Sequence, residues 1–99
     1  MTRTLRIRPE AEVELFAAAD WYESRKPGLG ADLVAAVDEA LELILEAPLA
    51  SPVWDPRLSH RIRVVRRFPY AVFFVVDHDD IDVVAIAHRK RTPGYWSER

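Results

Sequence analysis

His88 is the residue of this 99-residue chain whose type and position first suggest chemistry. It follows the apolar run Ile81 to Ala87, and imidazole changes its charge near neutral pH, so it could act as a general base. A histidine at the end of a strand more often serves as a hydrogen-bonded structural group or a packing partner, and both interpretations stay open. His60 and His78 add no metal-ligand spacing, and the chain has no cysteine. We therefore expect no metal site and no cofactor.

Four arginines close together in the chain are candidates for binding phosphate or a target: Arg61, Arg63, Arg66 and Arg67. Alternation places Arg61 and Arg63 on one face of a strand, whereas the face of the other two depends on how the pair Val64-Val65 is accommodated. Three other roles explain these arginines equally well. They could be solvated charges, they could form ion pairs with an acidic row on the second predicted helix (Asp38, Glu42 and Glu46), or they could contact an acidic segment of a partner.

The charge of the chain is unevenly distributed. Residues 1–56 carry five Lys/Arg against eleven Asp/Glu, and residues 57–99 carry nine against five, so a net charge of −2 conceals halves of −6 and +4. The basic half could meet a polyanion or an acidic protein surface.

Most aromatic residues are expected in the core, namely Trp21, Tyr22, Phe68, Phe73 and Phe74. Trp54, in a proline-rich segment, and Tyr95-Trp96, near the end of the chain, are harder to place. Aromatic side chains beside arginines can stack on unpaired bases or anchor a protein interface. We favour the interface for the tail.

Hydrophobic periodicity supplies the elements that would position these residues. Alternation predicts strands at 4–8 and 60–67, and apolar runs predict strands at 70–76 and 81–87, with 70–76 in the centre. Helical spacing predicts helices at 11–25 and 29–47, the first preceded by Pro9 and closed by Pro27-Gly28. Pro48, Pro52 and Pro56 are expected to prevent regular structure between 48 and 56. The pair Val64-Val65 could mark a bulge or a strand buried on both faces.

This order predicts an α+β fold: an N-terminal strand, an antiparallel two-helix hairpin, then a three-stranded antiparallel meander, in one mainly antiparallel sheet. Residues 1–99 are expected to form a single domain. We find neither a signal peptide nor an apolar stretch that could span a membrane, and we expect a cytoplasmic protein without membrane contact.

Three segments read together resemble one known family. They are Trp21-Tyr22-Glu23 near Pro27-Gly28-Leu29-Gly30, then Arg67-Phe68-Pro69-Tyr70, then His88 to Trp96. In order and spacing they are similar to the ParE/RelE toxin superfamily of type II toxin–antitoxin systems, over nearly the full chain. The resemblance implies a growth-arresting toxin that is neutralised by a cognate antitoxin.

The superfamily contains two activities. RelE-like members cut messenger RNA on the ribosome without a metal, and ParE-like members inhibit DNA gyrase. In RelE-like chains an arginine follows the aromatic residue of the central strand, but here Ala71 follows Tyr70. Arg91 and Tyr95 match the other catalytic positions, with Trp96 as an alternative aromatic residue.

The resemblance therefore favours a ParE-like gyrase inhibitor that is not an enzyme. The alternative is a ribosome-dependent ribonuclease that uses His88, Arg91 and Tyr95, with Arg66 or Arg67 in place of the missing arginine. Convergence of these side chains in one groove would favour the ribonuclease. A third hypothesis is a family member without toxicity that is retained as a partner of the antitoxin.

Overall fold

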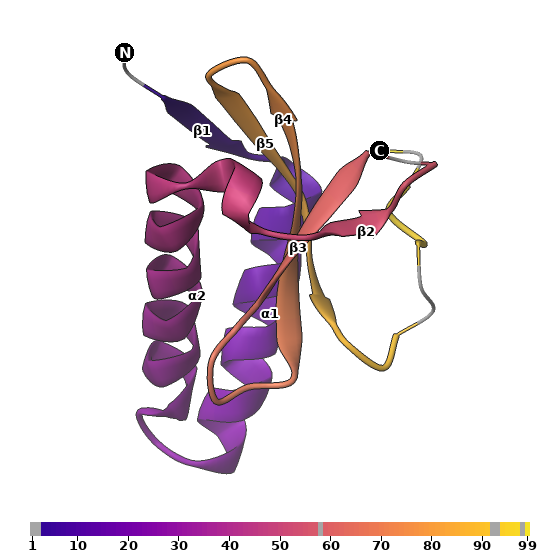
Figure 1. The fold of residues 1–99 in the computed structure, drawn as a ribbon. Coiled ribbons are helices and arrows are strands. Elements are labelled where there is room, and N and C mark those ends of the chain that lie inside the picture. The colour runs from indigo at the N-terminus through magenta and orange to yellow at the C-terminus, as the bar shows by residue number, and fades with distance from the viewer. Residues whose placement is uncertain (1–2, 58, 92–93, 98) are drawn as a thin grey trace.

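A computed structural model of the chain describes residues 3–57, 59–91, 94–97 and 99 (Figure 1). Thr92, Pro93 and Glu98 of the predicted tail lie outside the described residues. Every predicted helix and strand is present, with ends that differ by up to three residues. The elements are β1 (Thr4–Ile7), α1 (Pro9–Arg25), α2 (Leu29–Glu46), the 3-10 helix η1 (Pro48–Ala50), β2 (Val53–Asp55), β3 (His60–Val64), β4 (Tyr70–Asp77) and β5 (Asp80–His88).

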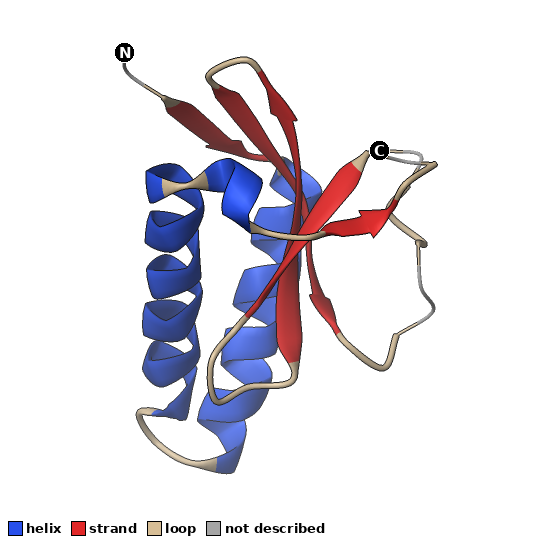
Figure 2. Cartoon of the chain, in the orientation of Figure 1, coloured by secondary structure: helices blue, strands red, loops and turns tan. Residues whose placement is uncertain are grey.

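One five-stranded sheet runs in the order β1-β5-β4-β3-β2. β1 pairs in parallel with β5, with Thr4 opposite Asp80, and the other three pairings are antiparallel. Both helices cover one face of the sheet (Figure 2). The predicted α+β class, the helical hairpin and the meander with β4 in the centre are therefore confirmed.

The expectation of an irregular segment at residues 48–56 was wrong, because the prolines occupy positions that need no amide hydrogen. Pro48 is the first residue of η1, where an N–H would have no partner within the helix. Pro52 precedes β2, and its carbonyl oxygen accepts a hydrogen bond of 3.0 Å from the amide of Ile62. β2 is an edge strand that pairs only with β3. Proline is tolerated at such an edge.

A carboxylate on α1 fixes the turn between the two helices. The Oε2 atom of Glu23 accepts the amide of Gly28 at 2.9 Å, and its Oε1 atom accepts the amide of Gly30 at 3.0 Å. These bonds satisfy amides at the start of α2 that have no partner within the helix. A Cβ atom on Gly30 would lie 2.5 Å from the carbonyl oxygen of Ala19. Glycine therefore allows the two helices to approach closely here.

The main core lies between the helices and the sheet. Leu33, Val37 and Ile44 of α2 have no exposed surface, and neither do Phe74 of β4 and Val83 of β5. No helix among the described residues is long and apolar enough to cross a bilayer.

The side chains of Val64 and Val65 point to opposite faces of the sheet, as in a regular strand. The pair therefore marks neither a bulge nor a strand that is buried on both faces. Val65 is 1% exposed on the helical side, whereas Val64 is 49% exposed. The irregularity lies instead between β4 and β5, where Phe73 pairs with Ala85 and Phe74 with Val83. The extra residue is Val84.

The other face of the sheet carries a second apolar cluster, which we call the outer cluster. Its centre is Trp96, which is 1% exposed, with its ring centroid 4.4 Å from that of Phe73 and 5.1 Å from that of Trp54. Residues near the end of the chain therefore cover this face. The core prediction was right for Phe68, Phe73 and Phe74 and wrong for Trp21, which is 53% exposed.

Candidate functional site

His88, Arg91 and Tyr95 line one groove of about 400 Å³, which we call the α1 groove. Ala17 and Trp21 of α1 form one side of it, and Tyr70 and the end of β5 also contribute. The three candidate catalytic residues therefore lie close together, as a ribonuclease would require. The partners of each side chain decide whether they can perform that chemistry.

The imidazole of His88 takes part in the turn that follows β5. Its Nδ1 atom accepts the backbone amide of Lys90 at 3.0 Å, which assigns the proton of the neutral ring to Nε2. The ring also makes an edge contact with Tyr70, at 5.2 Å between centroids. The lone pair of the neutral ring is thus already used, which matches the structural role considered for this histidine.

Arg91 lies against an aromatic ring. Its guanidinium carbon is 4.1 Å from the ring centroid of Tyr95, and that of Arg99 is 5.4 Å from the same centroid. Burial, together with a hydrogen bond to the Glu14 carboxylate and the charge of that carboxylate, raises the pKa of Tyr95 to about 12. This phenol therefore stays neutral at physiological pH, with its hydroxyl donated to the Glu14 carboxylate.

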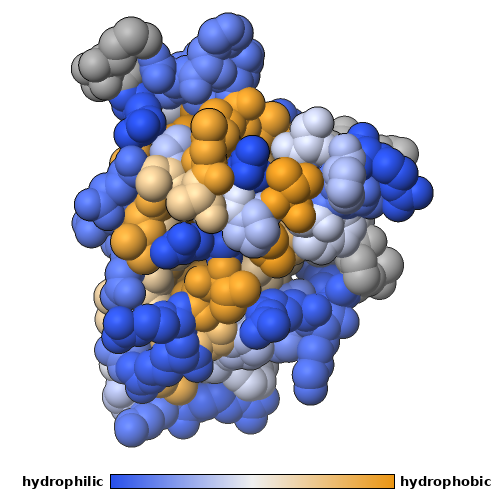
Figure 3. All heavy atoms as spheres, viewed as in Figure 1, coloured by the Kyte–Doolittle hydropathy of each residue, from blue (hydrophilic) through white to orange (hydrophobic). Residues whose placement is uncertain are grey.

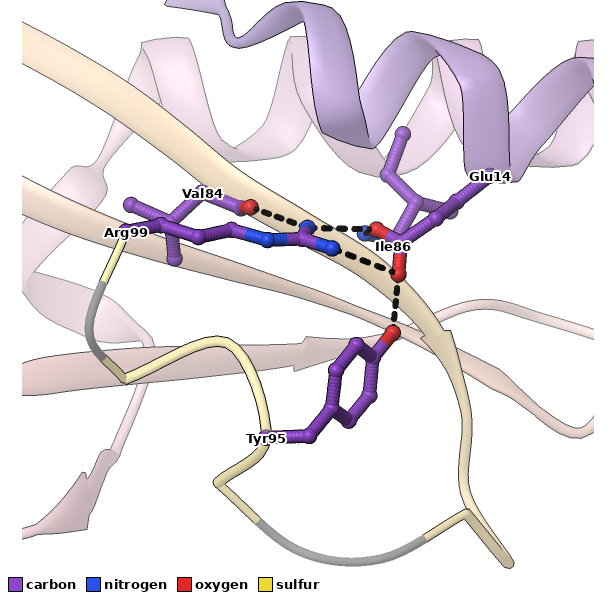
Figure 4. Close-up of polar contacts among 5 residues, drawn as sticks. All are labelled: Glu14, Val84, Ile86, Tyr95 and Arg99. Atoms are coloured by element: carbon purple, nitrogen blue, oxygen red, sulfur yellow. Dashed lines mark hydrogen bonds and ion pairs between the residues drawn. The ribbon is translucent and has the colours of Figure 1, made fainter.

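Glu14 is the centre of a network that ties the tail to the body of the protein (Figure 4). Its Oε1 atom accepts the amide of Ile86 at 3.1 Å and the Nη1 atom of Arg99 at 2.9 Å. Its Oε2 atom accepts the hydroxyl of Tyr95. Arg99 also donates to the carbonyl oxygen of Val84 at 2.9 Å. Glu14 is 12% exposed and Arg99 19%, so this is a largely buried ion pair.

Sequence reasoning missed the network because it gave no role to Glu14 or Arg99. A signal was present: Glu14 lies three residues after Ala11 and four before Ala18, both of which face the core. A carboxylate on that side of a helix needs a partner. The groove thus contains a negative charge that is satisfied within the protein, beside Arg91, which forms no ion pair with any described residue.

Arg61 and Arg63 do not contribute to the α1 groove. The Nη1 atom of Arg61 donates to the carbonyl oxygens of Ser51 at 2.7 Å and Leu49 at 3.4 Å, at the other end of β3. Arg63 lies opposite Val72 and is half-buried. The Arg61 side chain thus links β3 to the backbone around η1.

Arg66 and Arg67 point toward α2. Arg66 pairs with Glu39 at 3.4 Å and Arg67 with Asp32 at 3.3 Å. The expected ion pairs with the second helix therefore exist, although with other acids than the predicted row Asp38, Glu42 and Glu46. No arginine from 61–67 lines the groove that holds His88, Arg91 and Tyr95.

Trp96 lies in the outer cluster and not on the surface, because the sheet face beneath it is apolar and the tail folds back onto it. His60 begins β3 and packs on Trp96 at 4.7 Å between ring centroids. In the part of the chain that the structure describes, no group of three or more acidic or histidine side chains could hold a metal ion.

Exposed apolar side chains gather on α1 beside the groove. Val13 and Trp21, which are 67% and 53% exposed, line the α1 groove, whereas Phe16, which is 56% exposed, lies on another side of the helix. Another apolar region covers η1 and the start of β2, where Leu49 is 68% exposed (Figure 3). Apolar surface of this kind is typical of protein contacts.

Comparison with known proteins gives a family and a fold. The family model described as "ParE toxin of type II toxin-antitoxin system, parDE" matches residues 5–93. A solved structure titled "Chromosomal ParDE TA system from P. aeruginosa" has a chain that is similar with a TM-score of 0.75 and 20% identity, over 88% of this chain and 96% of that chain. No curated protein sequence matches.

Proposed function

Because the chain belongs to the ParE toxin family of type II toxin–antitoxin systems, we propose that it arrests growth by inhibiting DNA gyrase and is neutralised by a cognate antitoxin. Inhibition of this kind needs a binding surface and no catalytic centre. Membership of the family supports the role of the protein as a toxin. The structure of the α1 groove helps to choose between DNA gyrase and messenger RNA as its target.

One observation supports the choice of gyrase over messenger RNA: Tyr95 is bonded to the Glu14 carboxylate, which lines the same groove. Metal-free cleavage of RNA needs a base for the 2′-hydroxyl, positive charge on the phosphate and a proton donor for the leaving oxygen. Tyr95 donates to Glu14, and Arg99 is paired with the same carboxylate. His88 accepts a backbone amide at its Nδ1 atom. A phosphate in this groove would meet the Glu14 carboxylate.

The ribonuclease remains the second candidate because His88, Arg91 and Tyr95 share one groove. The missing arginine after Tyr70 weighs against it, since Arg66 and Arg67 point toward α2 and do not replace that arginine.

Purified gyrase and relaxed plasmid test the proposal. We expect the protein to block supercoiling in vitro and a brief induction in cells to produce a DNA-damage response with intact reporter messages. His88→Gln, which removes the candidate base, should inhibit supercoiling as strongly as the unchanged protein. Codon-phased cleavage of the messages that disappears in Arg91→Ala would instead establish the ribonuclease. Supercoiling at the normal rate in the presence of folded protein would contradict gyrase inhibition.

The antitoxin is proposed to bind the exposed apolar side of α1 and the groove beside it. Val13 and Trp21 line this groove and offer apolar surface that is 67% and 53% exposed. Antitoxins of this family typically contribute a segment that folds on the toxin, and such segments bury apolar anchors.

Co-expression of toxin and cognate antitoxin tests this surface. Val13→Glu should retain toxicity and weaken rescue by the antitoxin, because a charge would be buried at the contact. Leu49→Glu is the matched control, since it changes an equally exposed apolar residue over η1. Equal rescue of both variants would place the antitoxin elsewhere.

A further inference from the structure

Two segments that are distant in the sequence bring five cations to one end of the sheet, which we call the basic end. It consists of Arg66, Arg67, Arg89, Lys90 and Arg91. The first two lie in the turn between β3 and β4, and the other three follow β5. The segments are neighbours because Tyr70 pairs with His88 and the amide of Arg89 donates to the carbonyl oxygen of Pro69 at 2.8 Å. Figure 1 shows both at the lower end of the sheet.

The cations of the basic end are exposed and only partly neutralised. The side chains of Arg66 and Arg67 are 83% and 61% exposed, and their partners on α2 are also about half exposed. Such pairs contribute at most about 1 kcal/mol and exchange readily for another anion. Among residues 3–57, 59–91, 94–97 and 99, no ion pair involves Arg89, Lys90 or Arg91.

The rest of the protein has the opposite charge, which orients the basic end toward a polyanion. The five cations exceed their two carboxylate partners by three charges, whereas the whole chain has a net charge of −2. The acidic excess lies mainly on α2, which carries five carboxylates and no cation. A protein with this polarity approaches nucleic acid with its basic end first.

The aromatic side chains near the basic end are unsuited to stacking on unpaired bases. Tyr95 lies beneath Arg91 and is bonded to Glu14, and Trp96 is 1% exposed. Recognition of single-stranded RNA depends on such stacking. The basic end is also built from two turns, with no helix or strand that could enter a groove to read bases.

From this arrangement we propose that the basic end binds the phosphate backbone of duplex DNA, without sequence preference. This contact goes beyond the proposed function, because a protein can inhibit gyrase without touching DNA. It would place the toxin on the duplex that the enzyme holds. Contacts to phosphates position a protein on DNA and carry no sequence information.

Fluorescence anisotropy with a labelled duplex of about 20 base pairs and no gyrase tests the contact. Three engaged charges give a slope of about −2.7 for the logarithm of affinity against the logarithm of salt concentration, which is roughly a 40-fold loss between 50 and 200 mM salt. Arg89→Gln/Lys90→Gln should weaken binding and reduce the slope by about two.

The matched control is Arg6→Gln/Arg57→Gln, which removes two exposed arginines from the other end of the sheet and gives the same net charge. It should bind the duplex like the unchanged protein. Equal weakening by both double variants, or no binding at 50 mM salt, would overturn the proposal. Tighter binding to a single-stranded RNA of the same length would overturn it in favour of an RNA contact. A supercoiling assay of the same variants tests gyrase inhibition separately, so the two proposals can fail independently.

Discussion

Replacing Glu14 by leucine should destabilise the protein far more than replacing any of its exposed acidic residues. Glu14→Leu keeps a side chain of similar size and removes the acceptor shared by Arg99, Tyr95 and the amide of Ile86. The guanidinium of Arg99, which is 19% exposed, would then remain largely buried without its counter-ion.

The expected cost follows from this geometry. Breaking one side of a buried ion pair costs about 3–5 kcal/mol, because the remaining charge has lost both its partner and its water. For a domain of this size that loss lowers Tm by roughly 15–25 °C. Replacing both partners, as in Glu14→Leu/Arg99→Met, leaves no unpaired charge and should recover most of the stability. The double-mutant cycle should give a coupling energy of about 2–3 kcal/mol.

Urea unfolding followed by tryptophan fluorescence is a suitable assay, since Trp54 and Trp96 lie in the outer cluster that the tail covers. The matched control is the cycle Glu39→Leu/Arg66→Met. That pair is 47% and 83% exposed, so its coupling energy should be below about 1 kcal/mol. A coupling energy for Glu14 and Arg99 no larger than that of the control pair would refute the reasoning.

Two further predictions concern the tail and the helical hairpin. Because the pKa of Tyr95 is raised to about 12 in the folded protein from the ordinary value of 10, its contribution to stability is fully present below pH 10 and is lost as the pH rises toward 12. An ultraviolet titration should show a late tyrosinate step that Tyr95→Phe abolishes; an unchanged profile would contradict it. Gly30→Ala should cost about 2 kcal/mol, because the new Cβ meets the Ala19 carbonyl oxygen, whereas Gly28→Ala should cost about 1 kcal/mol, because Gly28 has a φ of 88° with no atom nearby. Thermal unfolding measures both, and the reverse order would contradict the packing argument.

The elements could be predicted from the sequence because their signals are local. Alternation at residues 4–8 and the apolar runs of β4 and β5 report strands, and Pro9 and Pro27-Gly28 report helix ends. The sequence did not predict η1 and β2, because a proline indicates only that a backbone amide donor is missing. A missing donor is harmless in an edge strand or in the first turn of a helix. The pairing of β1 with β5 joins the two ends of the sequence and has no local signal.

The site was harder to predict because its contacts are not local. Glu14 and Arg99 are 85 residues apart, and nothing near either residue indicates the other. Helical spacing alone could not decide which side of α1 faces the core, so Trp21 was expected inside. The Arg66-Arg67 turn and residues 89–91 are also distant in the sequence. Their proximity follows from the pairing of β4 with β5 and has no local signal.

The parallel pairing of β1 with β5 also affects when the protein can fold. β1 is synthesised first, but within the sheet its partner is the last strand to be made, and the ion pair of Glu14 waits for residue 99. Contacts between such distant residues slow folding, since a long loop must close before they form. An incomplete nascent chain lacks both the finished sheet and the fastened tail. The completed sheet and the ion pair of Glu14 with Arg99 therefore form only after nearly all of the described residues have been synthesised, so the early helices must wait for their full partner surface.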